Sequence, residues 1–253
     1  MQRGVPRSIF DPVSRTAGTT VCLALAGLVA GCVADGGDES ILVLKNVVPK
    51  DGCTVTPAEN ETALVSGALD VQAHTGYQFF AQLKSRITAT AAQLDQRRII
   101  TRGANVDITF ADSALFSAAE LAELDAKHLL HFMSPFSIDI APNGGITDVP
   151  FEVIPAELAR QVGDRPNFSS VVAQLSFKVV GDLSGGDVTS QSYTYSVTIL
   201  NHGLLNEKGL CSTVKTSFMP RVGNSCNPGQ DFVVDCCTDS TGLRVCPAVG
   251  TMM

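Results

Sequence analysis

The chain has 253 residues, 45% of them hydrophobic, with eight Cys, no Trp and a formal net charge of −7 at pH 7. This length permits a sizeable hydrophobic core, so disulfides would supplement that core rather than replace it. An acidic chain repels the phosphates of nucleic acid and gives no basic patch for anionic lipid, so we expect no nucleic-acid partner.

The N-terminus has the three-part order of a secretory signal, in which basic residues precede apolar residues and then small ones. Three arginines precede an uncharged run over residues 21–30, and Gly31 and Cys32 follow this run. As a helix the run rises about 15 Å, half of the roughly 30 Å hydrocarbon core, which is too short for a lasting membrane span. Residues 1–31 are therefore interpreted as a signal peptide.

The ending Leu28-Val29-Ala30-Gly31-Cys32 resembles the bacterial lipobox, with Val29 in place of the usual Leu. The resemblance implies cleavage after Gly31 and attachment of lipid to Cys32, which would tie the chain to a membrane of the bacterial cell envelope. Each buried CH₂ group contributes about 0.8 kcal/mol, so the acyl chains of a lipoprotein would anchor it firmly. Val33, in place of Asp after the Cys, favours the outer membrane by the enterobacterial rule. The alternative is an ordinary signal peptide cleaved near Ala30.

Residues 32–40 are small and acidic and cannot form a core, so they are predicted to be a flexible tether. A folded domain is expected over 41–200, and a Cys-rich tail packed on that domain over 201–253. Alternating apolar and polar residues between turn-forming residues indicate strands. The expected strands cover residues 41–48, 68–73, 77–87, 99–101, 105–110, 136–141, 149–154, 171–181 and 189–200.

Two short helices are expected among these strands. Ser117 and Glu120 have the spacing of a capping box, which predicts a helix near 118–131 with His128 on its apolar side. Pro155 stands where helices tolerate Pro and Gly163 where they end, which predicts a helix over 155–162.

The strongest predicted strand pair joins 171–181 to 189–200 through the turn-rich residues 182–187. Many strands with few helices favour a mainly β fold. We expect an antiparallel β-sandwich, Ig-like in character, with one or two short helices and a disulfide-rich C-terminal tail.

The order of several short motifs is similar to that of an uncharacterised family of lipoproteins from myxobacteria and related bacteria. The motifs are Gly67-Ala-Leu-Asp-Val71, Arg102-Gly-Ala-Asn-Val106, Val153-Ile-Pro-Ala-Glu-Leu-Ala159, Cys226-Asn-Pro-Gly-Gln-Asp231 and Cys236-Cys237. Members often carry cysteines at the end of the last long strand, where this chain has Leu200-Asn-His-Gly203. The resemblance implies a periplasmic or surface location and no particular activity.

Six cysteines remain once Cys22 leaves with the signal and Cys32 takes lipid, namely Cys53, Cys211, Cys226, Cys236, Cys237 and Cys246. In an oxidising compartment an even count indicates three disulfides. About 12 pairings stay open once a bond between adjacent Cys236 and Cys237 is excluded by its geometry. Five of the six lie in the tail, so at least one tail cysteine lacks a tail partner, and Cys53 is expected to pair with the tail.

The clearest candidate for site chemistry is the pair His128 and His131, which a helix would place one turn apart. Such a pair could bind a metal with a third ligand from elsewhere, although packing or surface roles are commoner for two histidines. Neither a Gly-x-Ser-x-Gly nucleophile motif nor a glycine-rich phosphate loop is present. No cofactor is expected, and the cysteine spacing does not suit zinc.

These features favour a lipid-anchored envelope protein that is a non-catalytic binding or structural module rather than an enzyme. Its expected partners are the membrane, through the lipid on Cys32, and an envelope protein. The alternative is a metal-dependent or hydrolytic periplasmic enzyme that uses His128 and His131. A third possibility is a eukaryotic secreted adhesion module with an accidental lipobox, which glycan on Asn60 or Asn167 would support.

Overall fold

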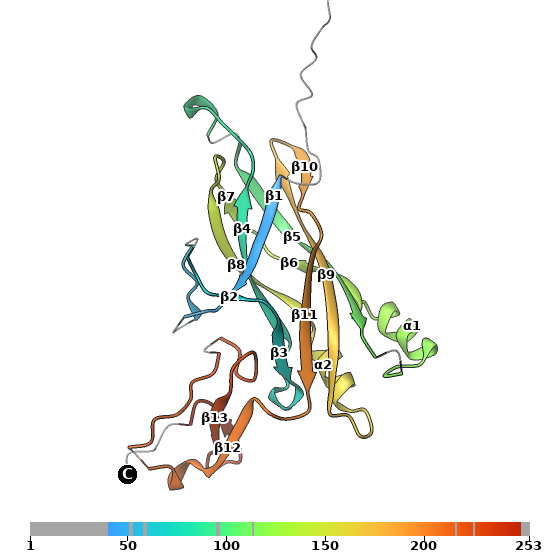
Figure 1. The fold of residues 1–253 in the computed structure, drawn as a ribbon, viewed down its shortest axis with the longest axis vertical. Coiled ribbons are helices and arrows are strands. Elements are labelled where there is room, and N and C mark those ends of the chain that lie inside the picture. Colours follow the sequence, from blue (N-terminus) through green and yellow to red (C-terminus); the bar gives the residue numbers. More distant parts are fainter. Residues whose placement is uncertain are drawn as a thin grey trace, which may run out of the picture. The chain divides into compact units, whose positions relative to one another are not determined.

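The structure is a computed structural model that describes residues 40–50, 53–57, 60–94, 97–112, 114–215, 217–224 and 226–248. The expected signal peptide over 1–31, its cleavage residue Gly31, the lipidation residue Cys32 and residues 32–39 of the expected tether lie outside the described residues. The described chain is mainly β, with two α-helices and three mostly antiparallel sheets (Figure 1). Within these ranges no helix is both long enough and apolar enough to cross a membrane.

One sheet has the strand order β2-β1-β4-β8, and its neighbouring strands are antiparallel. Its strands are β1 (Ile41–Val47), β2 (Ala63–Leu64), β4 (Tyr77–Ser85) and β8 (Ile146–Ile154). The expected strands at 41–48, 77–87 and 149–154 are confirmed, and β8 starts earlier than expected because Ile146 to Asp148 pair with Lys84 to Gln82. The short β2 was not expected from the sequence.

The second sheet has the order β3-β11-β9-β5-β6, and β10 and β7 pair with β9 and β5. Its strands are β3 (Gly67–Asp70), β5 (Ile99–Phe110), β6 (His131–Pro135), β7 (Asp139–Ile140), β9 (Ser170–Leu183), β10 (Gly186–Thr189) and β11 (Tyr193–Leu200). Strands β3 and β11 are parallel, and the other pairs are antiparallel.

The predicted pairing of 171–181 with 189–200 is confirmed by β9 and β11, which pair from Tyr193 opposite Phe177 to Leu200 opposite Ser170. The second segment is split, because β10 ends at Thr189 and β11 begins at Tyr193. Buried Ser190 fills the gap, since its hydroxyl accepts a hydrogen bond from the Val179 backbone N–H at 2.9 Å.

Strand β5 joins the two pieces expected at 99–101 and 105–110 into one strand. The register of its pairing with β9 shifts between Thr101 and Gly103, so the interruption seen in the sequence is a bulge rather than a strand end. Gly103 has a φ of 149°, and a Cβ at this position would collide with the backbone oxygen of Ser134 on β6. Glycine is therefore needed where β6 approaches.

Three other expectations are wrong in detail. The strand expected over 68–73 ends at Asp70, whose carboxylate accepts the Gln72 N–H and caps a short 3₁₀ helix over Val71–Ala73. The strand expected over 136–141 is reduced to β7. The helix expected near 118–131 is α1 (Ala118–Ala126), and the segment from His131 forms β6 instead. The second helix, α2 (Ala156–Gly163), follows Pro155 as predicted.

The main core lies between the inward faces of the two larger sheets, as the contacts of Phe79 on β4 show. Its ring centroid lies 4.9 Å from that of Phe177 on β9 and 5.1 Å from that of Tyr195 on β11, both in edge-to-face geometry. Phe151 on β8 meets the Phe177 ring at 5.3 Å. Large aromatic side chains bury much apolar area, so this cluster contributes strongly to the stability of the body, which we define as β1 to β11 with both helices.

The tail, defined as residues 201–248, has a small sheet of its own, which the sequence did not predict. Strands β12 (Leu205–Leu210) and β13 (Val234–Thr238) are parallel, and β14 (Arg244–Val245) pairs antiparallel with β13. Two disulfides lie within the tail, Cys211–Cys237 and Cys236–Cys246. The third, Cys53–Cys226, joins the segment after β1 to the tail, which is the kind of link that the cysteine count predicts.

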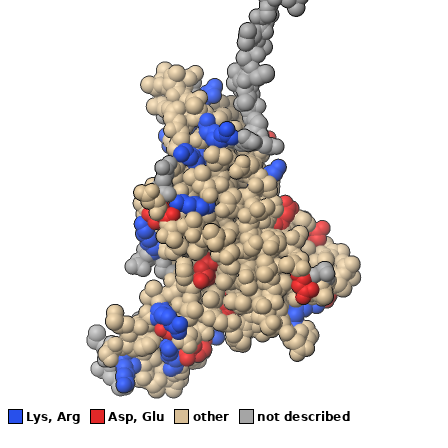
Figure 2. Space-filling view, viewed as in Figure 1, with Lys and Arg blue, Asp and Glu red and all other residues tan. Residues whose placement is uncertain are grey.

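Buried polar side chains also hold the tail to the body. Gln230 exchanges two hydrogen bonds with the backbone of Gln78 on β4, at 2.9 and 2.8 Å. Asp231 accepts from the Ala68 N–H at 3.1 Å and from the Tyr77 hydroxyl at 2.9 Å. Asp70 in turn accepts from the Leu204 N–H at 3.0 Å. On the face shown in Figure 2, most of the surface is uncharged and the charged groups are scattered.

Candidate functional site

The structure separates the two histidines that the sequence placed on one helix. His128 follows the end of α1 with a φ of 55°, a left-handed conformation that ends the helix. His131 is the first residue of β6 and lies opposite Asp107 of β5. The expected pair of imidazoles one helical turn apart is therefore wrong, because the helix ends at Ala126 and His131 already belongs to a strand.

His131 lies instead between two carboxylates. Its Nδ1 is 2.7 Å from Oδ1 of Asp107, and its Nε2 is 3.8 Å from Oδ1 of Asp125 near the end of α1. All three side chains are about half exposed, since their exposed fractions are 54%, 61% and 55% for His131, Asp107 and Asp125. The imidazole is thus oriented by one carboxylate while its other nitrogen faces a second.

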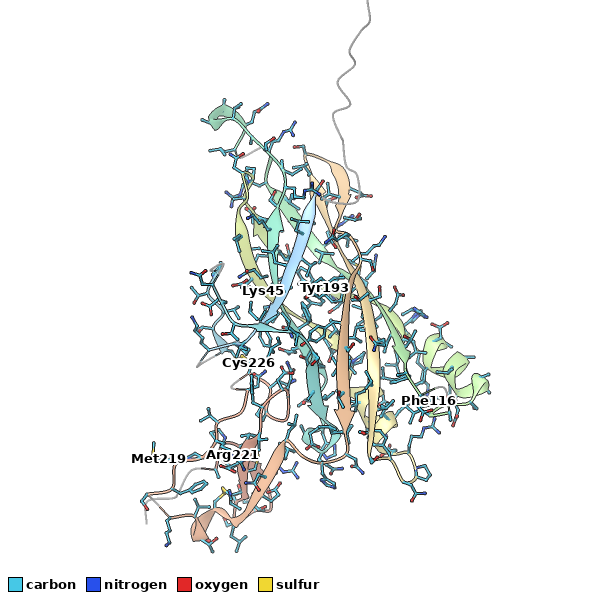
Figure 3. All side chains as sticks on the ribbon, in the orientation of Figure 1. Lys45, Phe116, Tyr193, Met219, Arg221 and Cys226 are labelled. Carbon is cyan, nitrogen blue, oxygen red and sulfur yellow. A yellow bond between two sulfur atoms is a disulfide. The ribbon has the colours of Figure 1, made fainter. Side chains whose placement is uncertain are left out.

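Helix α1, which supplies Asp125, is held in place at its N-terminus. The predicted capping box is present, because Ser117 Oγ accepts from the Glu120 N–H at 3.3 Å and the Glu120 carboxylate accepts from the Ser117 N–H at 2.7 Å. Arg165, beyond α2, donates to Glu120 at 2.7 Å and lies over the Phe116 ring at 4.1 Å. Figure 3 labels Phe116 in the segment that leads to α1.

The electrostatic effect of this contact is large. The hydrogen bond from Arg165 and those from Ser117 lower the pKa of Glu120 from its ordinary value to about 2. The Glu120 carboxylate is therefore charged at neutral and at mildly acidic pH. It lies at the N-terminus of α1, where the positive end of the helix dipole favours a negative charge.

A cavity of about 280 Å³ is lined in part by Leu121 of α1 and by His131. Its surface is mostly apolar. The lining residues are Ile108, Thr109, Phe110, Asp112, Phe116, Leu121, Leu130 and His131. The volume is close to the lower end of the range for small-molecule sites, about 300–1,000 Å³. We define this cavity with Asp107 and Asp125 as the α1 site.

The α1 site has the chemistry of a binding site for a small ligand. An apolar floor beside carboxylates and an imidazole suits a ligand with an apolar body and a cationic or hydrogen-bond-donating head. Within the described ranges, no Ser, Thr or Cys side chain is hydrogen-bonded to His131, so no Ser–His or Cys–His pair is assembled there. The described part of the chain also contains no group of three or more His, Cys, Asp or Glu side chains arranged to hold a metal ion.

Sequence reasoning missed Asp107 and the cavity. A sequence signal for Asp107 was present, because Asn105, Asp107 and Thr109 alternate with buried residues along β5 and so share its exposed face. The partnership with His131 could not be read from the chain, because His131 was expected at the end of the helix near 118–131 and not in a strand beside β5. The six predicted disulfide cysteines are all paired in the structure.

Comparisons with protein-family models, with curated proteins and with solved structures find no match for this chain.

Proposed function

We propose that the chain is a lipid-anchored protein of the bacterial cell envelope, held in the outer membrane through Cys32. Its domain, a β-sandwich of Ig-like character with a tail on it, is a non-catalytic binding or structural module. The observation that carries the proposal is the run Leu28-Val29-Ala30-Gly31-Cys32, which ends shortly before the described domain begins at Ser40. The resemblance to the family of lipoproteins from myxobacteria supports the same location.

The disulfides support a location in the cell envelope, outside the cytosol. All six cysteines after Cys32 are paired, and such bonds form and persist outside the reducing cytosol. The α1 site supports a binding role, since it combines a mostly apolar concave surface with a small number of polar groups beside it. An envelope protein is the other partner that we propose, and the loops at the ends of the strands are its natural contact surface.

The test is the intact mass of the non-reduced protein purified from membranes. The expected mass is that of residues 32–253 with acyl-glyceryl groups, less the hydrogens lost in three disulfides. A Cys32→Ser variant is expected to leave the membrane fraction, whereas Cys22→Ser, which changes only the signal segment, is expected to give the same mature mass. An unlipidated chain cleaved at another residue would contradict the proposal.

The second candidate is hydrolysis by a water molecule that His131 activates. The observation in its favour is the 2.7 Å contact of His131 Nδ1 with Asp107, which leaves Nε2 as the base beside the cavity. This candidate requires hydrolytic activity that His131→Ala abolishes and His128→Ala preserves. A metal-dependent version also requires stoichiometric metal, measured by mass spectrometry of the purified domain, that the same substitution removes.

A further inference from the structure

A second cavity lies in the tail, away from the α1 site. It has a volume of about 380 Å³ and is lined by Lys208, Thr213, Val214, Lys215, Ser217 and Phe218. Most of its surface is apolar. We call it the tail cavity, and from the charges and the apolar surface that meet in it we propose that it binds a small amphiphilic anion, a carboxylate or phosphate monoester carried on an apolar body.

The walls of the tail cavity are fixed by a disulfide and a small core. Cys211 and Cys237 are bonded and form a buried cluster with Ala248. Val214 and Phe218, which line the cavity, pack against this cluster. Side chains that are already held in place before a ligand binds lose less conformational entropy on binding than mobile ones, which favours affinity.

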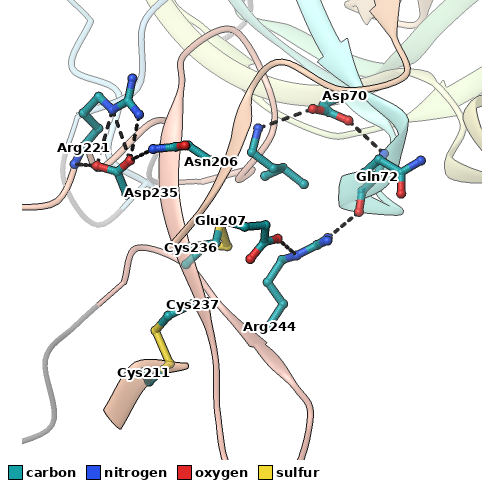
Figure 4. Close-up of a disulfide and its surroundings, with 12 residues drawn as sticks. Asp70, Gln72, Asn206, Glu207, Cys211, Arg221, Asp235, Cys236, Cys237 and Arg244 are labelled. Carbon is teal, nitrogen blue, oxygen red and sulfur yellow. Dashed lines mark hydrogen bonds and ion pairs between the residues drawn. A yellow bond between two sulfur atoms is a disulfide. The ribbon is translucent and has the colours of Figure 1, made fainter. Parts of the chain in front are cut away.

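The cavity is cationic, and none of the described residues that line it is acidic. Lys208 Nζ lies 3.4 Å from Asp235 Oδ1, but Asp235 also accepts hydrogen bonds from Arg221, at 2.8 Å for the Nη2 contact, and from Asn206 (Figure 4). Arg221, through its hydrogen bonds, holds the pKa of Asp235 below its ordinary value, so that carboxylate is fully charged. Lys208 and Arg221 thus share the Asp235 carboxylate, and the Lys215 side chain has no ion pair among the described residues.

This excess of positive charge is local, because the whole chain has a net charge of −7. Figure 2 shows basic side chains on the tail, and Figure 3 labels Arg221 there. The overall acidic balance predicted no basic patch, and it could not show that Lys208 and Lys215 meet across one cavity. Positive charge beside a low-dielectric wall attracts an anion more strongly than the same charge in open solvent.

The apolar part of the ligand has its own contacts in this cavity. Val214, the ring of Phe218 and the alkyl stems of the two lysines provide an apolar surface. The Lys208 ammonium lies 5.4 Å from the centre of the Phe218 ring, which places the cationic and apolar parts of the site side by side. Ser217 adds a hydroxyl that can donate to the anion.

Two sources can present an anion on an apolar body, namely a small molecule free in solution and the headgroup of an anionic membrane lipid. Octanoate and lipid vesicles distinguish these two sources. The anion site itself does not rest on the lipid anchor proposed above.

The experiment is a titration of the purified chain with octanoate at neutral pH, followed by calorimetry and by NMR shifts of residues 208–218. Two matched probes serve as controls. Octanol has the apolar chain but no charge, and inorganic phosphate has the charge but no apolar chain. We expect saturable binding of octanoate, centred on Lys215 and Phe218, and much weaker binding of both other probes. Octanol binding as tight as octanoate would overturn the proposal.

Lys215→Met is the decisive variant, because the Lys215 side chain has no hydrogen bond or ion pair among the described residues. The substitution keeps the bond from the Phe218 N–H to the Lys215 carbonyl and so leaves the tail contacts intact. We expect it to weaken octanoate binding roughly tenfold or more, since it removes a charge-assisted contact to the carboxylate. Arg244→Met, which removes a tail cation outside this cavity, is expected to leave the affinity unchanged. Equal affinity in Lys215→Met and the unchanged chain would refute the site.

Vesicles distinguish the two sources of the anion. Vesicles of phosphatidylglycerol are expected not to bind the unlipidated chain more tightly than vesicles of phosphatidylcholine, while octanoate binds. Binding to the phosphatidylglycerol vesicles without binding of octanoate would overturn the small-ligand proposal in favour of a membrane-surface role. A failed lipid-anchor test would leave the octanoate result unaffected, so the two proposals fail separately.

Discussion

Tyr77 donates its phenolic hydrogen to Oδ1 of Asp231 over 2.9 Å and thereby joins β4 to the tail across 154 residues of sequence. The Tyr77 hydroxyl also accepts from Asn46 Nδ2 at 3.2 Å and lies 3.2 Å from the Tyr195 hydroxyl. Burial, and next the charge of Asp231, raise the pKa of Tyr77 well above its ordinary value, and burial raises the pKa of Asp231. The tail is thus attached through a few desolvated polar groups, each of which needs its partner.

Replacing Tyr77 with Phe should therefore destabilise the protein. The change removes the donor to Asp231 and leaves Asn46 Nδ2 with one acceptor fewer in a buried position, so we expect a loss of about 1–3 kcal/mol in the free energy of unfolding. Urea denaturation measures this loss. Tyr193→Phe is the control, because the Tyr193 ring packs on Phe79 while its hydroxyl has no hydrogen bond among the described residues.

The control is expected to change stability by less than about 0.5 kcal/mol. Equal losses in the two variants would show that removing either hydroxyl has the same effect whether or not it is hydrogen-bonded, which would contradict the role given to the hydrogen bonds of Tyr77.

Asp148 on β8 should make the protein less stable as the pH rises. Its Oδ1 accepts from Gln82 Nε2 at 3.1 Å, but its buried Oδ2 has no hydrogen-bond partner, and burial raises its pKa. A carboxyl whose folded-state pKa is raised binds its proton more tightly when folded. Its contribution is therefore most favourable below the ordinary pKa of 3.8 and is lost as the pH rises through the folded-state value.

Asp148→Asn keeps an acceptor for Gln82 and removes the buried charge. We expect a gain of roughly 1 kcal/mol in the free energy of unfolding at neutral pH, which disappears in acid. Thermal unfolding measured across the pH range checks both parts. Asp187→Asn, which removes an exposed partner of Arg102, should give no gain. A gain for Asp148→Asn that is the same at every pH would contradict the assignment.

The contribution of Glu120 to stability should depend on pH in the opposite direction. Its pKa is lowered from 4.5 to about 2, first by Arg165, so its contribution to stability is present above 4.5 and is lost as the pH falls toward 2. An NMR titration of the Glu120 carboxyl is expected to have its midpoint near 2. In Arg165→Gln the midpoint should move back toward 4.5, and α1 should lose protection from amide exchange. A midpoint unchanged by that substitution would mean that the capping box alone sets the pKa.

The Cys53–Cys226 bond should stabilise the protein chiefly through the unfolded chain. It spans 173 residues, and a loop of that length gives about 3–5 kcal/mol in the chain-entropy model. Because Cys53 is exposed, Cys53→Ala removes little packing. Cys53→Ala, Cys226→Ala and the double variant should therefore lose the same amount in urea unfolding, since the bond acts as a unit.

A loss below about 1 kcal/mol in all three variants would show that the polar contacts of Gln230 and Asp231 already restrain the tail without the bond.

The sequence by itself determined the strands whose residues alternate between core and solvent. Strand β9 is the clearest example, since its side chains alternate in burial along most of its length. It also determined the start of α1, because the bonds between Ser117 and Glu120 lie within four residues of chain. The pairing of Cys53 with the tail followed from cysteine counting. These features rest on local spacing or on number, both of which a sequence carries directly.

Only the tertiary structure decided where α1 ends and what His131 contacts. The capping box starts the helix, but the 118–131 segment has no Gly or Pro to mark its end in the sequence, and the edge of β5 offers backbone partners that draw His131–Pro135 into β6. Likewise Tyr77 and Asp231, and Lys208 and Lys215 across the tail cavity, meet only after folding. Such contacts depend on which distant segments come together. A buried polar group needs a partner close to it in space, and the spacing of residues along the chain does not show which group that partner is.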